Sequence, residues 1–137
     1  MLESLYKEAI LDHYKRPRNR GELAAATRVE TEINPSCGDE LELFLRLEDE
    51  RITGVSFVGE GCAISQASAS MMTEAVAGKT LDEAREMSQQ FKEMLRGEPP
   101  APALGELKVL QGVAKLHARV KCAALAWVAL DKALRSD

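Results

Sequence analysis

Three cysteines and one aspartate are the residues of this 137-residue chain whose types could do chemistry together. Cys37 and Asp39 lie in the segment NPSCGDE at residues 34–40; Cys62 comes 25 residues after Cys37, and Cys122 60 residues after Cys62. If three thiolates and a carboxylate converge, they form a tetrahedral S3O site that suits zinc or iron–sulfur chemistry. These spacings match no local zinc motif such as paired CxxC, so convergence is a hypothesis about the fold.

Each of these residues also has a simpler interpretation. Free cysteine is among the most buried residue types, so any of the three could be a core thiol. An aspartate beside a glycine commonly caps a turn, and the residues alone leave capping and ligation by Asp39 equally open. An odd number of cysteines argues against a disulfide framework.

The elements that must position these side chains follow from periodicity and from proline and glycine. Helical patterns cover residues 3–16, 63–78, 80–97 and 117–135, with a further short piece near 104–112. Strand patterns cover residues 28–34, 39–47 and 52–61. Residues 98–105 form a proline-rich connector. Strands with tight connections followed by helices predict an α+β fold. We expect a single domain over 1–137, with a three-stranded antiparallel β-sheet and four to five helices packed mainly on one face.

The expected elements place the cysteines at or near element ends. Cys37 falls in the turn between the first two strands, Cys62 where the third strand leads into a helix, and Cys122 in the first turns of the last helix. The positive end of the helix dipole favours a thiolate at Cys62. Lys121 and Arg119 would favour a thiolate at Cys122 in the same way.

The chain has two histidines that could supply a nitrogen ligand. His13 belongs to the first helix, where we expect a polar surface role. His117 precedes Cys122 by five positions, about 140° around a helix, so the two side chains would not share a face. A role for His117 beside the site stays open, and Asp39 is the better fourth ligand.

Composition and charge narrow the function classes. The chain is 45% hydrophobic and 29% charged with a net charge of −4, which disfavours nucleic acid as a partner. No apolar run approaches the roughly 20 residues of a membrane span. The amphipathic N-terminal segment carries acidic residues, unlike a secretory signal or a transit peptide, so we expect a cytoplasmic protein.

Three segments together resemble the iron–sulfur cluster assembly scaffold family, which includes IscU and the N-terminal domain of NifU. These are NPSCGDE, GEGCAISQASASMMTEAVAGK and LQGVAKLHARVKCAALAW, and the similarity runs from LYKEAILDHYKRPRN to the last helix. Scaffolds of the IscU type have a histidine directly before the third cysteine, where this chain has Lys121. That substitution and the segment GEPPAPALGELKVLQG resemble the SufU-type branch.

The resemblance implies a ligand set, a reaction and partners. Proteins of the SufU-type branch bind zinc through residues that correspond to Cys37, Asp39, Cys62 and Cys122, and they are implicated in taking sulfane sulfur from a PLP-dependent cysteine desulfurase. We expect Cys37 to be the sulfur acceptor because it lies in a turn. The alternative is a non-enzymatic scaffold that builds a labile [2Fe–2S] cluster from iron and passes it to apo iron–sulfur proteins or downstream assembly factors. A purely structural zinc domain would instead have a closed Cys/His ligand set.

Overall fold

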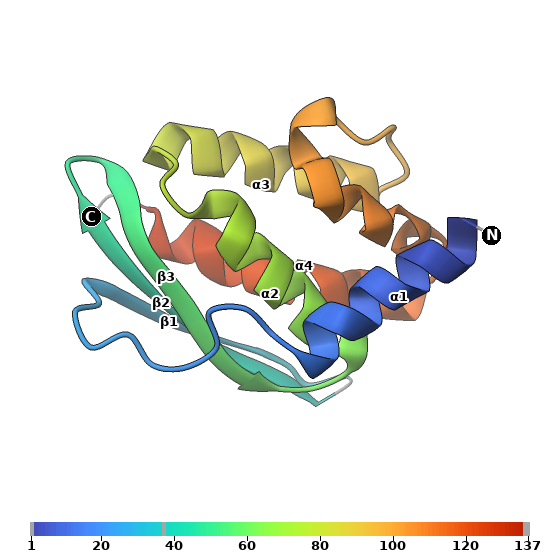
Figure 1. The fold of residues 1–137 in the computed structure, drawn as a ribbon, viewed down its shortest axis with the longest axis horizontal. Coiled ribbons are helices and arrows are strands. Elements are labelled where there is room, and N and C mark those ends of the chain that lie inside the picture. The colour runs from blue at the N-terminus through green and yellow to red at the C-terminus, as the bar shows by residue number, and fades with distance from the viewer. Residues whose placement is uncertain (1, 37, 136–137) are drawn as a thin grey trace.

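The computed structural model describes residues 2–36 and 38–135. The elements follow one another as α1 (Leu2–Lys15), β1 (Arg28–Asn34), β2 (Asp39–Glu48), β3 (Arg51–Glu60), α2 (Ala63–Val76), α3 (Leu81–Leu95), η1 (Pro102–Lys115) and α4 (His117–Ala133). Figure 1 shows the helices gathered on one side of the sheet. The predicted α+β class, the three-stranded antiparallel sheet and the helices on one face are confirmed.

The sheet is a meander with strand order β1-β2-β3. Asn34 pairs with Asp39 where β1 turns into β2, and Glu48 pairs with Arg51 where β2 turns into β3. Because successive side chains of a strand point to opposite faces, Asp39 shares a face with the leucines that follow it at every second position. These leucines are almost completely buried: Leu41, Leu43 and Leu45. The face that they form is covered by α2 and α4.

The predicted bounds agree with the structure to within one residue for every strand and two for most helices. The difference lies before the last helix, where the connector ends earlier and the helical piece is longer than expected. Pro102 begins η1, a 3-10 helix that continues to Lys115. A proline suits the first turn of a helix because its fixed φ is already helical and no N–H partner is needed there.

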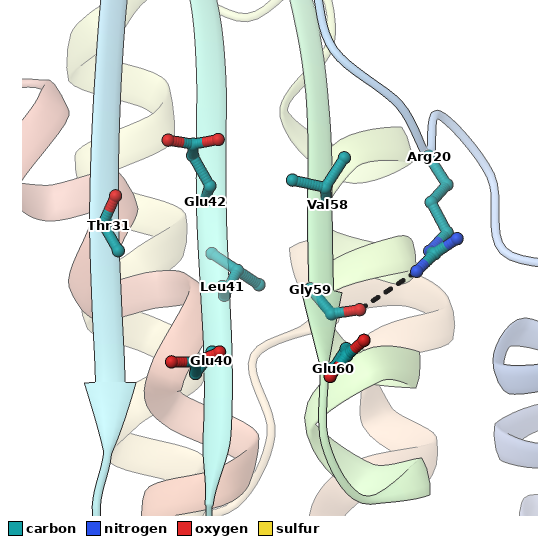
Figure 2. A pocket seen from close by; sticks show the side chains of 8 residues that line it. All are labelled: Arg20, Thr31, Glu40, Leu41, Glu42, Val58, Gly59 and Glu60. Atoms are coloured by element: carbon teal, nitrogen blue, oxygen red, sulfur yellow. Dashed lines mark hydrogen bonds between the residues drawn. The ribbon is translucent and has the colours of Figure 1, made fainter.

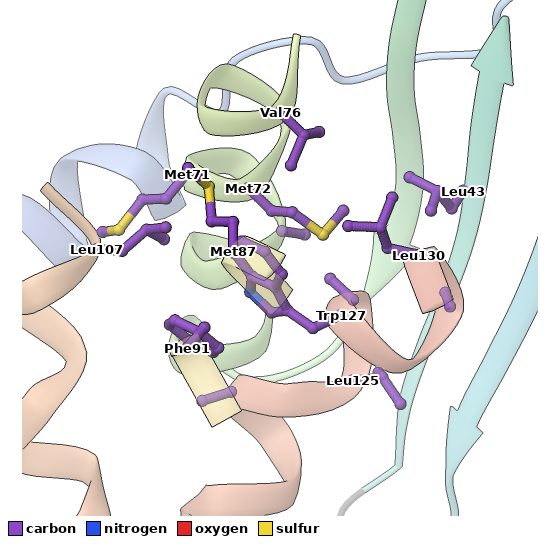
Figure 3. Close-up of a cluster of buried hydrophobic side chains, with 14 of the residues drawn as sticks. Leu43, Met71, Met72, Val76, Met87, Phe91, Leu107, Leu125, Trp127 and Leu130 are labelled. Atoms are coloured by element: carbon purple, nitrogen blue, oxygen red, sulfur yellow. The ribbon is translucent and has the colours of Figure 1, made fainter. Parts of the chain in front are cut away.

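The hydrophobic core lies between the sheet and the outer helices. Trp127 of α4 is fully buried and stacks on Phe91 of α3, with ring centroids 4.7 Å apart and an interplanar angle of 19°. The indole N–H of Trp127 donates to Ser68 Oγ of α2 at 3.2 Å, and the Ser68 hydroxyl donates to the carbonyl of Ala123 at 2.7 Å. Met71 and Met72 of α2 and Met87 of α3 belong to the same buried cluster (Figure 3). The stack and the hydrogen bonds fix α4, which carries Cys122, against α2 and α3.

Helix α1 packs on α2, and Ile10 and His13 lie on the side that faces the core. The prediction of a polar surface role for His13 is wrong, because this side chain is only 1% exposed. The next residue, Tyr14, is 44% exposed. His13 can be buried because both ring nitrogens have polar partners, Ser70 and Glu106.

A membrane span would need a longer and more apolar helix than any in the described part of the chain.

Candidate metal centre

Asp39 opens β2 with a carboxylate that is fully buried. The backbone N–H of Cys62 donates to Asp39 Oδ1 at 2.8 Å, and Asp39 Oδ2 lies 3.9 Å from Cys62 Sγ. A buried carboxylate is costly unless it is hydrogen-bonded or paired with a cation. The contact with Cys62 therefore fixes the junction of β3 and α2 against the start of β2.

Gly61 is required by this contact. A Cβ at position 61 would lie 2.2 Å from Asp39 Oδ1 and 2.8 Å from Ser65 Oγ, far inside van der Waals distance. Only a residue without a side chain lets the Asp39 carboxylate approach the backbone here. The glycine thus creates the space in which the carboxylate meets the first cysteine of the cluster.

Cys62 is the N-cap of α2 and is half-buried. Its Sγ accepts a hydrogen bond from the backbone N–H of Ser65 at 3.4 Å, and the hydroxyl of Ser65 donates back to the carbonyl of Cys62 at 3.1 Å. The Cys62 sulfur thus accepts the capping hydrogen bond that a serine or aspartate oxygen accepts at most helix N-termini. The expected position of Cys62 at a helix N-terminus is confirmed.

Cys122 comes from the second turn of α4 and is fully buried. Its Sγ lies 3.8 Å from the carbonyl oxygen of Ala118, one turn earlier. The ligand atoms of Asp39, Cys62 and Cys122 all lie within 4.8 Å of one another. Two sulfurs and one carboxylate from three separate elements thus meet, as the convergence hypothesis requires for these three residues.

Cys37 lies outside the described residues, so its predicted ligation and sulfur-acceptor role stay predictions. The described residues on either side of it, in the turn between Asn34 and Asp39, are held by hydrogen bonds. Asn34 accepts the backbone N–H of Gly38 on its carbonyl at 2.9 Å and that of Ser36 on its side-chain oxygen at 3.3 Å. Because Asn34 pairs with Asp39, this turn starts and ends beside the buried carboxylate.

Arg119 is the basic residue that the structure brings to the thiols. A hydrogen bond to Cys122, together with the charges of Cys62 and Cys122, raises the pKa of the exposed Arg119 guanidinium above its ordinary value. Lys121 and His117 are exposed on α4. His117 takes no part in the ligand cluster formed by the described residues. Of the three basic residues that we expected near the site, the structure thus places Arg119 there.

The outer face of the sheet carries a different kind of hollow, of about 400 Å³ (Figure 2). Arg20 donates to the carbonyl of Gly59 at 3.0 Å along one side of it. Glu40 and Glu60 lie directly opposite each other in the strand register, and like charges in that position repel. The hollow offers oxygen ligands without sulfur, and Glu40 points away from the face that carries Asp39. Of these two places, the thiol-containing cluster is the one that fits a zinc or iron–sulfur group.

Known proteins that are similar in sequence match almost the full length of the chain. Residues 5–136 match the family model described as the NifU-like N terminal domain. The chain is 44% identical over 138 residues to the zinc-dependent sulfurtransferase SufU of Bacillus subtilis, which covers 99% of this chain and 93% of that protein. It is 43% identical over 136 residues to the iron–sulfur cluster assembly scaffold protein IscU of Streptococcus pyogenes, with coverage of 98% and 85%.

Solved structures with the same fold come from two further organisms. The crystal structure of FiSufU from Fervidobacterium islandicum AW-1 has a TM-score of 0.91 at 38% identity, covering 97% of this chain and 98% of that one. The N-terminal part of a NifU-like protein from Brucella abortus has a TM-score of 0.88 at 28% identity, with coverage of 97% and 94%.

Proposed function

The chain belongs to the NifU-like N-terminal domain family, and on that basis we propose that it is an iron–sulfur cluster assembly protein that accepts sulfane sulfur. The sulfur donor is a PLP-dependent cysteine desulfurase. The acceptor site is a zinc centre with Cys37, Asp39, Cys62 and Cys122 as ligands. The similarity to a protein named a zinc-dependent sulfurtransferase supports this proposal over the whole chain.

The observation that carries the proposal is the convergence of Asp39, Cys62 and Cys122, whose ligand atoms lie within 4.8 Å of one another. They come from β2, from the N-terminus of α2 and from α4. Cys37 is two residues from Asp39 in the turn that ends at the cluster, so a third sulfur is within reach along the chain.

The donor set fits zinc. Thiolates and a carboxylate are the ligands of tetrahedral zinc sites, and two of the three described donors, Asp39 and Cys122, are fully buried. Bound zinc would supply a positive charge that keeps the cysteines as thiolates. Asp39 is the hardest of the four donors and so the most easily exchanged.

The side chains of the site have different roles in the proposed sulfur transfer. The thiolate of Cys37 attacks the terminal sulfur of the desulfurase persulfide, a new S–S bond forms on Cys37, and the desulfurase cysteine leaves as a thiolate. One S–S bond breaks as the other forms, so the step needs no external oxidant or reductant. The Sγ of Cys62 accepts a backbone hydrogen bond at the start of α2, and Cys122 is fully buried, so both are less suited to reach a partner, and Cys37 is the proposed acceptor.

A second candidate function is a scaffold that assembles a labile [2Fe–2S] cluster and delivers it to apo-proteins. It is favoured by the similarity to proteins named IscU scaffolds and by a carboxylate in the ligand set, since an oxygen ligand makes a cluster easier to release. Metal content separates the two functions. Tightly bound zinc favours sulfur transfer, whereas a reconstituted cluster that is delivered rapidly favours the scaffold.

The test of sulfur transfer is a persulfide-transfer assay with a cysteine desulfurase, run on zinc-loaded and metal-free protein. We expect zinc-loaded protein to accept sulfur and metal-free protein to lose most of this activity. Cys37→Ala should abolish acceptance, and Ser36→Ala, a matched control at the neighbouring exposed residue, should retain it. Equal transfer with and without zinc contradicts the proposed zinc centre, and persistent transfer in Cys37→Ala contradicts the role of Cys37.

A further inference from the structure

We propose that His13, Glu74 and Glu106 form a second cation site, which takes a divalent transition-metal ion through one imidazole nitrogen and two carboxylates. Their ligand atoms lie within 4.8 Å of one another. The residues come from α1, α2 and η1, so a bound ion would connect three helical segments. The site does not depend on the proposed sulfur transfer.

The imidazole of His13 is oriented as a metal-binding histidine needs to be. The ring is buried, and Nδ1 lies 2.8 Å from Ser70 Oγ, which also accepts the backbone N–H of Arg18 at 2.8 Å. Nε2 points to the carboxylates, 2.7 Å from Glu106 Oε1 and 3.8 Å from Glu74 Oε1. In metal sites the second ring nitrogen is commonly held by a hydrogen bond of this kind, which fixes the ring. A bound ion would replace the proton that Nε2 shares with Glu106, and Nδ1–H would then donate to Ser70 Oγ.

The distances are close to those of a coordination shell. Ligand bonds of about 2.0–2.2 Å in a tetrahedral zinc site place neighbouring donor atoms about 3.3 Å apart. The distances of Nε2 from Glu106 and Glu74 lie on either side of this value, so shifts of the two flexible glutamates complete the geometry.

The charges around the imidazole favour a cation. Arg18 lies 3.9 Å from Glu74, but it is closer to Asp12, at 2.7 Å, and Asp12 also pairs with Arg16. Three carboxylates therefore share two guanidinium groups in this network. With a neutral imidazole, the carboxylates of Asp12, Glu74 and Glu106 and the guanidinium groups of Arg16 and Arg18 together carry one net negative charge.

The two carboxylates are open to solvent, which gives an ion a path to the buried nitrogen. Their side chains are 49% and 55% exposed. Glu74 and Glu106 also border a surface hollow of about 520 Å³ between α2 and η1. Gly105 precedes Glu106 with a positive φ of 54°, and this interrupts the helical backbone of η1 at the site.

The donor atoms define the class of ion. One imidazole nitrogen and two carboxylates suit Zn²⁺, Fe²⁺, Co²⁺ or Mn²⁺, whereas soft ions such as Cu⁺ prefer sulfur. Glu74 lies twelve residues after Cys62, about 18 Å along the axis of α2 at the normal helical rise. This distance makes the proposed site separate from the thiol cluster.

The test is a titration of zinc-loaded protein with Co²⁺, in which binding is monitored by absorbance and by calorimetry. We expect one equivalent of Co²⁺ to bind with visible d–d bands and without a sulfur-to-cobalt charge-transfer band. Glu106→Gln should weaken this binding at least about tenfold. Glu86→Gln, an exposed substitution on α3, is the matched control and should leave it unchanged.

Ring nitrogen NMR gives an independent measurement on the unsubstituted protein. Zn²⁺ added beyond the first equivalent should shift the Nε2 resonance of His13 and leave that of the exposed His117 unchanged. The proposal is contradicted if no second equivalent binds, if Glu106→Gln binds as tightly as Glu86→Gln, or if a sulfur-to-cobalt band appears. The zinc-dependent transfer assay is unaffected by any of these results, so the two proposals fail separately.

Discussion

At the scale of single residues, the site depends on a close approach between a carboxylate and a backbone. Asp39 is buried where the Cys62 N–H can reach it, and Gly61 leaves the room for that contact. The sequence predicted Asp39 as a ligand or as a turn cap, and it could not separate the two. In the structure the carboxylate accepts the backbone N–H of Cys62 across the fold and lies within 4.8 Å of two thiols, and its role as a ligand stays a prediction.

Replacing Gly61 by Ala should disrupt the site selectively. The added Cβ would displace the Asp39 carboxylate, because the two atoms cannot stay 2.2 Å apart, and overpacking of this kind costs about 1–3 kcal/mol. We expect a large loss of zinc affinity in a chelator competition. Gly112→Ala, where a Cβ would have no neighbour within 4 Å, is the control. Equal zinc affinity in the two variants would show that Asp39 is not a ligand.

Arg119 gives a second prediction at this scale. Its guanidinium is held by Cys122 and by the charges of both described thiols, so it places a positive charge beside the cluster. We expect Arg119→Ala to slow sulfur acceptance from the desulfurase and Arg119→Lys to restore part of the rate, since lysine keeps the charge but not the planar fork of donors. Lys121→Ala, exposed on the same helix, is the control. Unchanged transfer by Arg119→Ala would contradict this role.

At the scale of elements, local sequence signals predicted most of what positions the site. Leucines at every second position gave β2, and the GEGC segment gave the junction at which Cys62 caps α2. The capping box of α3 is a third local signal. Thr80 accepts the N–H of Glu83 at 3.1 Å, and the Glu83 carboxylate accepts the N–H of Thr80 at 2.9 Å. Each of these signals lies within a few residues of the structure that it predicts.

The capping box makes a stability prediction. Thr80→Ala should lower the free energy of unfolding by about 1 kcal/mol in urea denaturation at neutral pH. A smaller effect than that of Asp82→Ala, which changes an exposed residue in the first turn, would contradict the cap.

The same box predicts a dependence on pH. Two hydrogen bonds with Thr80 hold the pKa of Glu83 below its ordinary value of 4.5. The bond with the Thr80 backbone has the larger effect, and the bond with its side chain has the smaller one. A depressed pKa stabilises the folded state above the unfolded-state pKa, and this contribution is lost as the pH falls through the folded-state value. The gap in melting temperature between the unsubstituted protein and Glu83→Gln should therefore narrow as the pH falls below 4.5. A difference in melting temperature that stays constant from pH 7 downward would contradict the lowered pKa of Glu83.

At the scale of the whole molecule, the site exists only in the folded chain. The separations of 25 and 60 residues between the cysteines span the sheet and the helical layer, so no local pattern contains them. The resemblance to a known family made the ligand set predictable, and the match over residues 5–136 confirms that resemblance. The spacing of the cysteines alone did not predict this ligand set.

The burial of His13 shows where sequence reasoning ended. Its partners Ser70 and Glu106 are 57 and 93 residues away along the chain, and only the folded structure brings them together. A polar residue on a helix is expected at the surface because burial without hydrogen bonds is costly. That expectation fails when distant partners supply the bonds, as they do here.

The hydrogen bonds of Ser68 test how the core holds α4 and with it Cys122. Ser68→Ala would leave the buried indole N–H of Trp127 and the carbonyl of Ala123 without this partner. We expect a loss of about 1–3 kcal/mol in the free energy of unfolding. The exposed Ser36→Ala is the control, and a loss no greater than in Ser36→Ala would contradict this role of Ser68.

The most direct test of the central claim is to locate the transferred sulfur. Zinc-loaded protein is reacted with a cysteine desulfurase and cysteine, its thiols are blocked, and the peptides that contain Cys37, Cys62 and Cys122 are compared by mass spectrometry. We predict one added sulfur atom on the Cys37 peptide and none on the other two. A persulfide on Cys62 or Cys122, or on none of the three cysteines, would contradict the claim.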